Sequence, residues 1–543
     1  MTDETLVEWR EWGADAFADA READRPVLLF LTAPWCDWCD RMEREAYGNP
    51  AVAANVADDF VPVRVDVDRR PRVRERYQMG GFPSTVFLTP DGEVITGATY
   101  LSTEALRSVV ERVRETWTDR GDDAGRIPRA LQDPDPPRGT LDSSVEAHMA
   151  GQLEVAYDET YGGWGTDAKF PLPRTVAFAL KRDRSRALRT LDAVYTHLYD
   201  TYDGGFYRYA SNRDWSDPHR EKLLDENAAL VRAFADAYLY TGDEGYRDPA
   251  LGTVDYLTTD LWTGEAFAGS QAGGGDYYTL EPTEREAADP PHVDSTVFAD
   301  RNGLAAEALL RLHAYTDDET CRRYADRALS HVRGTLLDGG AVTHFDGPDS
   351  ETGLLADQAR VLGALTTAAQ IAGEGLGDAR EVADWTVEHC RAEDGTFLDA
   401  PLDADSPALL DRPLRPLDTT VELADALVDL AVLTGEDSYR EVAREALSAF
   451  AGARDRMGVE VAGYATAAAR VVDTPLTISV ADDPGSDLHR AALRMSDHEK
   501  VVVPDADATG GHERGTAWVR VGDSTSEPAD SPAELQRRVE AHT

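Results

Sequence analysis

Hydrophobic and polar positions follow two different patterns along the chain. In the first part, apolar runs of strand length, such as VLLFLT from Val27 and the stretch 60–67, alternate with amphipathic segments. The stretch 80–101 reads in order as a proline, a strand, an Asp-Gly turn and another strand. Farther along, apolar residues recur at helical spacing in long segments rich in Ala, Leu and Arg, such as 224–242 and 298–316. These patterns predict a multidomain chain, with an α/β domain followed by an all-α domain.

Domain boundaries follow from the change of pattern. Residues 1–119 form the predicted α/β domain, and residues 120–140 concentrate Pro, Gly and charge, as a linker does. Residues 141–472 form the predicted helical domain. Residues 473–543 are expected to form a carboxyl-terminal α/β extension.

The helical segments come in pairs, separated by turns in which glycine stands near an aromatic residue. Six such turns predict six helical hairpins, and the turns begin at Tyr161, Asp203, Gly264, Asp338, Glu393 and Ala462. Their uneven spacing, roughly 40 to 80 residues, indicates a degenerate repeat in which each hairpin buries its neighbour's apolar face. We favour a closed (α/α)6 toroid over an open solenoid, because closure would gather the aromatic and acidic turns at one mouth.

The chain is strongly acidic. Its formal net charge is −46 at pH 7, and lysine occupies only four positions among 55 basic residues. Such a surface resembles that of proteins adapted to molar salt, where screening over about 3 Å weakens the repulsion between carboxylates. It argues against nucleic acid or an anionic membrane as a partner, since both require clustered Lys and Arg. The sequence also lacks a basic, apolar leader and a membrane-length apolar run, so a halophile's cytoplasm is the expected compartment.

A Cys-x-x-Cys motif, Cys36 to Cys39, follows the first apolar run and heads a helix-like segment. Two cysteines at this spacing can close a small disulfide, and a helix amino terminus stabilises the attacking thiolate. Cys36 is the expected nucleophile and Cys39 the resolving thiol. Half of a zinc site is the alternative, but no second Cys-x-x-Cys or Cys/His cluster follows, so no metal is expected.

Other features narrow the chemistry further. No nucleotide-binding glycine loop is present in the sequence, and no cofactor is therefore expected. The two remaining cysteines, Cys321 and Cys390, lie on helical stretches and are expected to be buried structural thiols.

The order of elements around the motif is similar to that of thioredoxins. In that fold the proline before the third strand, here Pro83, is cis and lies against the cysteines, where its missing N–H leaves room for a substrate backbone. An ordinary X-Pro turn is the alternative. Two residues depart from the pattern. Phe30 stands six positions before Cys36, where thioredoxins carry a buried carboxylate that accepts a proton, and Asp37 places a negative charge that opposes thiolate formation.

Over most of its length, the chain resembles the family of thioredoxin-domain proteins typified by spermatogenesis-associated protein 20. The resemblance rests on motifs in a fixed order: CDWCDRMEREAY, YGGWGTDAKFPLP, DPHREKLLDENA, NGL and DQA. It implies a thioredoxin-like domain followed by a toroid similar to N-acylglucosamine 2-epimerases and six-hairpin glycosidases. The chain also departs from this family. Asp37 and Asp40 replace two histidines, GSQAGGGD at 269–276 replaces an acidic stretch, and Arg520 and Thr525 replace two cysteines.

Candidate residues for a toroid site gather at one turn and the helix after it: His219, Glu221, Lys222, Asp225 and Asn227. Glu221 and Asp225 are four apart, so they are expected to share a helix face, as an acid/base pair or a sugar-hydroxyl clamp would. Helix capping and surface ion pairing are the alternative. Because lysine is so rare here, Lys169 and Lys222 are singled out as bases or carbonyl ligands. Weaker candidates are Asp294, Asn302 and Asp357.

Three functional hypotheses follow. The first is a thiol–disulfide oxidoreductase that uses Cys36, Cys39 and Pro83 on protein thiol or disulfide clients. The second is a carbohydrate-active isomerase, epimerase or hydrolase, whose toroid binds a small sugar while the thioredoxin domain is structural. The third is a non-enzymatic scaffold. The sequence does not indicate an oligomeric state.

Overall fold

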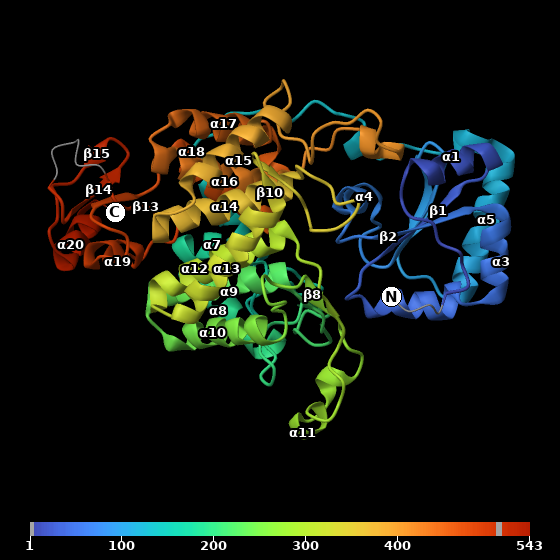
Figure 1. Cartoon of the computed structure of the whole chain (residues 1–543), viewed down its shortest axis with the longest axis horizontal. Helices are drawn as coiled ribbons and strands as arrows, with labels where there is room; N and C mark the ends of the chain where they lie inside the picture. Colours follow the sequence, from blue (N-terminus) through green and yellow to red (C-terminus); the bar gives the residue numbers. More distant parts are fainter. Residues whose placement is uncertain (1–4, 507–512, 543) are drawn as a thin grey trace. The chain divides into compact units, whose positions relative to one another are not determined.

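The computed structural model describes residues 5–506 and 513–542, which divide into two compact units (Figure 1). The first unit contains the chain up to Asp135 and two later segments, Gln271–Asp294 and Pro401–Leu414. The second unit contains Pro136–Ser270, Ser295–Ala400 and the chain from Arg415 onward. The first unit is therefore discontinuous in sequence, which the single boundary expected at residues 120–140 did not anticipate.

The first unit is built on a four-stranded sheet in the order β2-β1-β3-β4. Strand β1 pairs parallel with β2 and antiparallel with β3, which pairs antiparallel with β4. Helices flank this sheet on both sides (Figure 1). Its elements are α1 (Ala14–Ala23), β1 (Val27–Thr32), α2 (Asp37–Met42), a π-helical turn (Glu43–Tyr47), α3 (Pro50–Asp59), β2 (Val61–Asp66), α4 (Pro71–Tyr77), β3 (Ser84–Leu88), β4 (Val94–Ala98) and α5 (Thr103–Arg120).

This sheet forms because the strands carry the apolar runs that the sequence shows. All six residues of β1 are buried, whereas β2 alternates between buried and half-buried positions. A fully apolar strand is typical of a central position covered on both faces, and β1 lies between β2 and β3. The expected α/β domain of thioredoxin type is confirmed, and the Phe82–Pro83 peptide bond is cis, as expected.

The segment Pro401–Leu414 packs against α4. Arg72 donates to the carbonyl of Leu410 at 2.7 Å, and Arg76 donates to the carbonyl of Leu409 at 2.9 Å. Nearby, a Cβ placed on Gly92 would lie 2.2 Å from the Cβ of Ala408, so only glycine allows this approach. Buried guanidinium groups thus bind the backbone of this segment, and the side chains of Leu409 and Leu410 are buried as well.

The second unit contains a closed ring of six helices. Each of these inner helices contacts the next, and α18 contacts α7, which closes the ring. They are α7 (Pro173–Arg182), α9 (Leu224–Thr241), α12 (Ala299–Thr316), α14 (Leu355–Ala372), α16 (Leu417–Thr434) and α18 (Gly463–Val472). Outer helices pack against them: α6 (Ser144–Ala156), α8 (Arg184–Leu198), α10 (Glu244–Thr259), α13 (Glu319–His331), α15 (Leu376–His389) and α17 (Asp437–Ser448). The expected (α/α)6 toroid is therefore confirmed.

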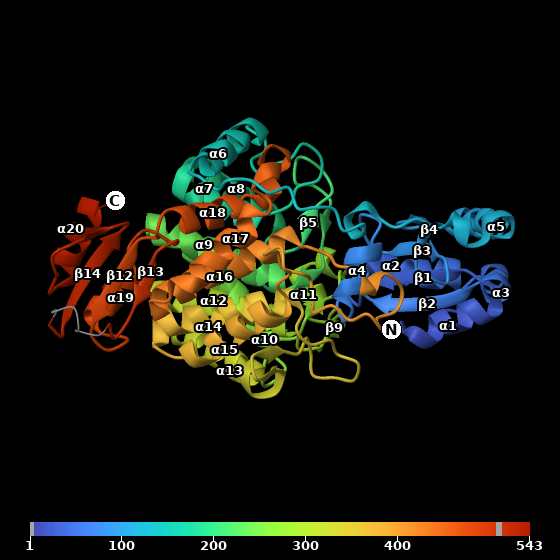
Figure 2. The same cartoon turned by 90° about the horizontal axis from the view of Figure 1, so that it is seen from above.

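A second small sheet follows the toroid, in the order β13-β12-β14-β15 (Figure 2). Its elements are β12 (Thr477–Ala481), α19 (Asp487–Leu493), β13 (Val501–Val503), β14 (Thr516–Val521), β15 (Ser524–Thr525) and α20 (Pro532–His542). By packing contacts, it belongs to the same unit as the toroid. Among the described residues, no helix combines the length and the hydrophobicity that crossing a membrane requires.

Candidate functional site

The two cysteines of the motif lie at the amino end of α2, where they form a disulfide. Cys36 caps the helix, and its Sγ accepts a hydrogen bond from the backbone N–H of Cys39 at 3.2 Å. Cys39 is fully buried, whereas Cys36 keeps 6% of its surface exposed. This asymmetry fits a nucleophile at Cys36 and a resolving thiol at Cys39, because the helix amino terminus favours a thiolate at its cap.

Aromatic packing brings the cis-proline loop to the motif. The rings of Phe82 and Trp35 meet edge to face, with centroids 6.0 Å apart, and Pro83 follows Phe82 directly. The indole N–H of Trp35 donates to Oδ2 of Asp68 at 2.8 Å. Burial, together with the neighbouring Asp68 carboxylate, raises the pKa of Asp66. The region around the cysteines is thus apolar on the proline side and acidic at the end of β2.

Asp37, between the two cysteines, holds the segment Gln271–Asp294. Its Oδ2 accepts a hydrogen bond from the backbone N–H of Gly275 at 3.2 Å. A Cβ on Gly273 would lie 2.8 Å from the same carboxylate oxygen, so Asp37 would have to shift if this residue carried a side chain. Asp37 therefore anchors a distant part of the chain beside the disulfide, a role that the sequence did not reveal.

The two lysines singled out in the toroid are structural. Lys169 donates to Oδ2 of Asp158 at 3.0 Å and to two backbone carbonyls, and its side chain is fully buried. Lys222 makes the equivalent bond to Oδ2 of Asp200 at 2.9 Å and another to the carbonyl of Gly204. Each ammonium thus closes a glycine-rich turn. Neither lysine lines the cavity described below.

Asn227 and Asn302 also have a structural position. Each is the fourth residue of its helix, α9 or α12, and its side chain both donates to and accepts from the backbone of the preceding turn, at Phe206 and Phe267 respectively. Gln358, the fourth residue of α14, bonds the backbone of the preceding turn in the same way. These amides bind the turns to the inner helices. The same hydrogen-bond pattern therefore recurs in three of the helical hairpins.

The remaining candidates are dispersed. The expectation that Glu221 and Asp225 share a helix face is wrong, because α9 begins at Leu224 and Glu221 precedes it. Glu221 accepts from Arg208 at 3.3 Å, and His219 stacks on Tyr209 with ring centroids 4.1 Å apart. The other candidates are placed as follows: Asp225 lines the toroid cavity, Asp357 belongs to a buried cluster, and Asp294 belongs to the first unit beside Asp66.

A cavity of about 390 Å³ lies among the inner helices of the toroid. Nine acidic residues contribute to its wall: Asp225, Glu226, Asp236, Glu307, Glu422, Asp425, Asp429, Glu460 and Glu499. Seven basic residues accompany them: Arg174, Arg208, Arg232, Arg311, Arg360, Arg470 and Lys500. Many are paired, for example Glu422 with Arg174 at 2.7 Å and with Arg360 at 2.8 Å. The lining is therefore charged but nearly balanced.

Two cavity residues, Glu226 and Lys500, have pKa values that are shifted to near neutrality. Burial raises the pKa of Glu226 to about 8, although the nearby Arg208 opposes the shift. Burial also lowers the pKa of Lys500 to about 8. A carboxylic acid and an amine that both titrate near neutral pH are suited to proton transfer. The sequence reading missed both, although Glu226 lies between two chosen candidates and Lys500 is one of the four lysines.

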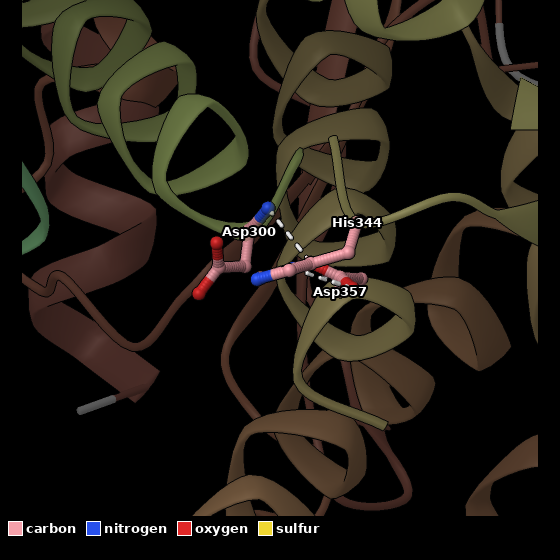
Figure 3. A group of neighbouring side chains, drawn as sticks. All are labelled: Asp300, His344 and Asp357. Atoms are coloured by element: carbon pink, nitrogen blue, oxygen red, sulfur yellow. Dashed lines mark hydrogen bonds and ion pairs between the residues drawn. The ribbon is translucent and has the colours of Figure 1, made fainter. Parts of the chain in front are cut away.

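A second cluster, formed by Asp300, His344 and Asp357, lies at the amino ends of α12 and α14 (Figure 3). Nδ1 of His344 lies 3.0 Å from both carboxylate oxygens of Asp357, and its other ring nitrogen points toward Asp300 (Figure 3). Burial raises the pKa of Asp357. Burial alone would also raise the pKa of Asp300, but the neighbouring Arg360 brings it below its ordinary value.

These donors match a metal site in type, because a histidine and two carboxylates lie within 4.8 Å of one another. The partners already present argue against that use. Arg360 donates to Oδ2 of Asp300 at 2.7 Å, and a guanidinium at this distance repels a cation. The cluster is better suited to a buried histidine–carboxylate pair than to a metal centre.

Comparison with known proteins agrees with this division of the chain. Residues 2–132 match the family model Thioredox_DsbH, described as "Protein of unknown function, DUF255". Part of the chain is 31% identical over 107 residues to thiol:disulfide interchange protein DsbD 1 of Pseudomonas aeruginosa, which is 19% of this chain and 18% of that protein. Among solved structures, cellobiose 2-epimerase from Spirochaeta thermophila covers 56% of this chain and 85% of its own, with a TM-score of 0.44 and 17% identity.

The chain also matches spermatogenesis-associated protein 20. The human protein is 32% identical over 295 residues, and the rat protein is 30% identical over 296 residues. Each match covers 47% of this chain and 37% of the relative, so the chain matches little more than a third of these relatives. The resemblance to the family typified by spermatogenesis-associated protein 20 is confirmed, with a Thioredox_DsbH domain at the amino end of the chain.

Proposed function

We propose that this protein is a thiol–disulfide oxidoreductase that acts through Cys36 and Cys39. The observation that supports this most directly is the pair of cysteines in disulfide contact at the amino end of α2, with the more accessible one, Cys36, at the helix cap. In the reduced protein, the Cys36 thiolate attacks a client disulfide, and Cys39 then attacks Cys36 to release the client. Two electrons pass from the two cysteines to the client.

The expected clients are proteins that present an extended segment. Pro83 has no N–H of its own, so a substrate backbone can approach it beside the cysteines without burying an unpaired donor. Access to Cys36 is narrow, because only 6% of the residue is exposed and Asp37 beside it holds the backbone of Gly275. Clients with exposed, flexible disulfides are therefore favoured over compact ones.

The test is the reduction potential of the Cys36/Cys39 pair, measured by thiol trapping in molar KCl. High salt is chosen because the acidic surface fits a halophile's cytoplasm. We expect a defined potential within the cytosolic range of about −200 to −300 mV. Disulfide-exchange activity should disappear in Cys36→Ser. Absence of a disulfide, or an unaffected mutant, would exclude the proposed function.

A second candidate function is the binding and conversion of a small sugar in the toroid cavity. One observation favours it: Glu226 lies in the cavity wall with a pKa of about 8, so at neutral pH it is a protonated acid that can donate a proton to a ligand oxygen. A neutral, hydroxyl-rich ligand suits a wall whose charges are already paired. Titration calorimetry with a panel of monosaccharides tests this candidate. Heats that are the same for the wild type and Glu226→Gln would exclude a role for this acid.

A further inference from the structure

The structure contains a buried carboxylate close to the motif, although the position where thioredoxins carry one is Phe30. Phe30 lies in the middle of β1, with Arg64 of β2 as its register partner. Nη1 of Arg64 donates to Oε1 of Glu43 at 2.9 Å. The side chain of Glu43 is 4% exposed, and that of Arg64 is 23% exposed. A carboxylate is thus held next to the expected position, but it comes from the cysteine helix instead of from the strand.

Glu43 also shares a helix face with the resolving cysteine. The backbone N–H of Glu43 donates to the carbonyl of Cys39, so the two residues are one helical turn apart. Residues at this spacing have Cβ atoms about 5 to 6 Å apart. Both are buried: Cys39 is fully buried, and Glu43 is 3% exposed. Their side chains therefore lie on the same, inward face of the helix.

On its other side, Phe30 is flanked by a second polar contact. Thr85 of β3 is the other register partner of Phe30, and its Oγ1 lies 2.9 Å from the hydroxyl of Tyr47. The cysteine helix and its π-helical continuation therefore bond to the sheet at two points, through Glu43 and Tyr47. The ring of Phe30 packs on Tyr47, with ring centroids 4.9 Å apart. These contacts fix the cysteine helix, and Glu43 with it, against the sheet.

We propose that Glu43 is the proton acceptor for Cys39 and does the work of the carboxylate that is missing at Phe30. This role rests on the proposed thiol–disulfide exchange. A buried thiol at Cys39 must lose its proton before it can attack, and burial opposes formation of its thiolate. A carboxylate one turn away supplies a base, directly or through one water molecule. Arg64 holds that carboxylate in place through its hydrogen bond.

The step balances as follows. Cys36 is first joined to a client sulfur in a mixed disulfide. The Cys39 thiol gives its proton to the Glu43 carboxylate, and its sulfur attacks Sγ of Cys36. The Cys36–Cys39 bond forms, the bond between Cys36 and the client breaks, and the client sulfur leaves with the electron pair. Glu43 then returns its proton to solvent or to the departing thiolate.

A purely electrostatic effect of Glu43 makes the opposite prediction. A negative charge close to Cys39 would raise the pKa of its thiol, so removing that charge would make the thiolate easier to form. Substitution of Glu43 by glutamine would then accelerate the attack by Cys39. If Glu43 is the base, the same substitution slows that attack.

The experiment separates the two attacks on the full chain. The reduced protein is mixed with dithiobis(nitrobenzoate), which releases one coloured thiolate when Cys36 attacks and a second when Cys39 resolves the mixed disulfide. Glu43→Gln is compared with the wild type between pH 5 and 9. Glu45→Gln is the matched control, because Glu45 lies in the same turn but is exposed and pairs with Arg41. The Cys39→Ser variant cannot resolve the mixed disulfide, so it reports the rate of the first thiolate release alone.

We expect Glu43→Gln to leave the first release unchanged and to slow the second by about tenfold or more below pH 8, since general-base catalysis contributes about 10²-fold or more. The control should match the wild type. A second release in Glu43→Gln that is as fast as in the wild type, or faster, overturns the assignment. If the wild type releases no thiolate at all, the proposed function fails instead.

Two further variants cover the case in which the loss of Glu43 disturbs folding. Glu43→Asp keeps a carboxylate on the helix, and it should retain most of the second release. Phe30→Asp in the Glu43→Gln background places a carboxylate opposite Arg64, and it should restore part of the rate. Equal second-release rates in the Asp and Gln variants at position 43 would overturn the role as a base.

Discussion

The cysteine helix and the toroid cavity handle buried charge in different ways. One turn after Cys39, the buried carboxylate of Glu43 pairs with one arginine, Arg64 of β2. Around the cavity, nine acidic and seven basic residues share partners, and Glu422 alone pairs with two arginines. Loss of the Glu43 charge would leave one arginine without this partner, whereas loss of the Glu422 charge would affect two arginines at once. Glu226, by comparison, pairs with Arg208 at 3.4 Å.

The largest effect is expected when a buried ion pair of the toroid is broken, at Lys222. Lys222→Met removes the partner of Asp200, a residue that is 3% exposed, and breaking a buried pair in this way costs about 3–5 kcal/mol. We therefore expect a large drop in the urea midpoint. The control is Lys181→Met, which should cost less, because the Lys181 side chain is 36% exposed and its buried partner Glu499 also pairs with Arg182. Equal midpoints in the two variants would contradict a structural role for Lys222.

The next largest effect concerns Glu226 and depends on pH. The folded-state pKa of about 8 lies above the ordinary value of 4.5, so the folded protein holds this proton more tightly than the unfolded chain. Its contribution to stability is complete below about pH 4.5 and is lost as the pH rises through about 8. Glu226→Gln removes this dependence, so its stability relative to the wild type should rise with pH between those limits. The rise should be smaller than the full linkage slope, because the Glu226 side chain is 36% exposed and solvent screens part of the effect.

Unfolding of Glu226→Gln and the wild type at pH 6, 7 and 8 measures this effect. Glu244→Gln is the control, because Glu244 is an exposed residue at the start of α10 that pairs with Arg247 of the same helix. Its stability should follow that of the wild type at each pH. A constant difference between Glu226→Gln and the wild type would show that Glu226 is already ionised at pH 6.

A smaller effect is expected at Asp37, which combines a charge with a hydrogen bond. Asp37→Asn keeps an oxygen acceptor for the N–H of Gly275 and removes the charge, whereas Asp37→Ala removes both. Both variants should accelerate the first thiolate release a few-fold, because a like charge near Cys36 is lost. Hydrogen exchange at Gly275 should become faster only in Asp37→Ala. Faster exchange in both variants would show that the charge, and not the acceptor, holds the segment.

The smallest effect is expected from metal removal. Arg360 already forms an ion pair with the Asp300 carboxylate. Dialysis against EDTA should therefore leave the melting temperature unchanged, and added Mn²⁺ or Zn²⁺ should not raise it. His344→Ala is a useful comparison, since it removes the partner of buried Asp357 and should lower the melting temperature without any metal. A rise with Zn²⁺ in the wild type that disappears in His344→Ala would establish a metal centre at this cluster.

The sequence was sufficient where the chemistry is local. The strand before the motif and the cysteine pair follow from short segments whose neighbours along the chain are also neighbours in space, whereas the cis-proline was expected from the similarity to the thioredoxin order of elements. The order of strands and the closed ring of hairpins were also within reach, because each depends on a repeated pattern.

Sequence reasoning was insufficient where contacts join distant segments. Lys169 and Lys222 were predicted to be catalytic or ligand-binding because lysine is rare in this chain. In the structure their ammonium groups instead bond to aspartates of glycine-rich turns. Glu226 and Lys500, 274 positions apart by their numbers, share one cavity wall, and no spacing rule connects them. The carboxylate of Glu43 was overlooked because only the register of β1 with β2 reveals Arg64 opposite Phe30.

The discontinuous first unit has a consequence for how this protein is made. Arg72 and Arg76 find their carbonyl partners on Leu409, Leu410 and Arg412, which are synthesised long after the domain that needs them. At about 5–20 residues per second, the ribosome takes roughly 15 to 60 s to pass from Asp135 to Leu414. During that interval Arg72 and Arg76 lack these carbonyl partners, and the first unit is incomplete. The first unit can therefore be completed only after most of the toroid has been translated.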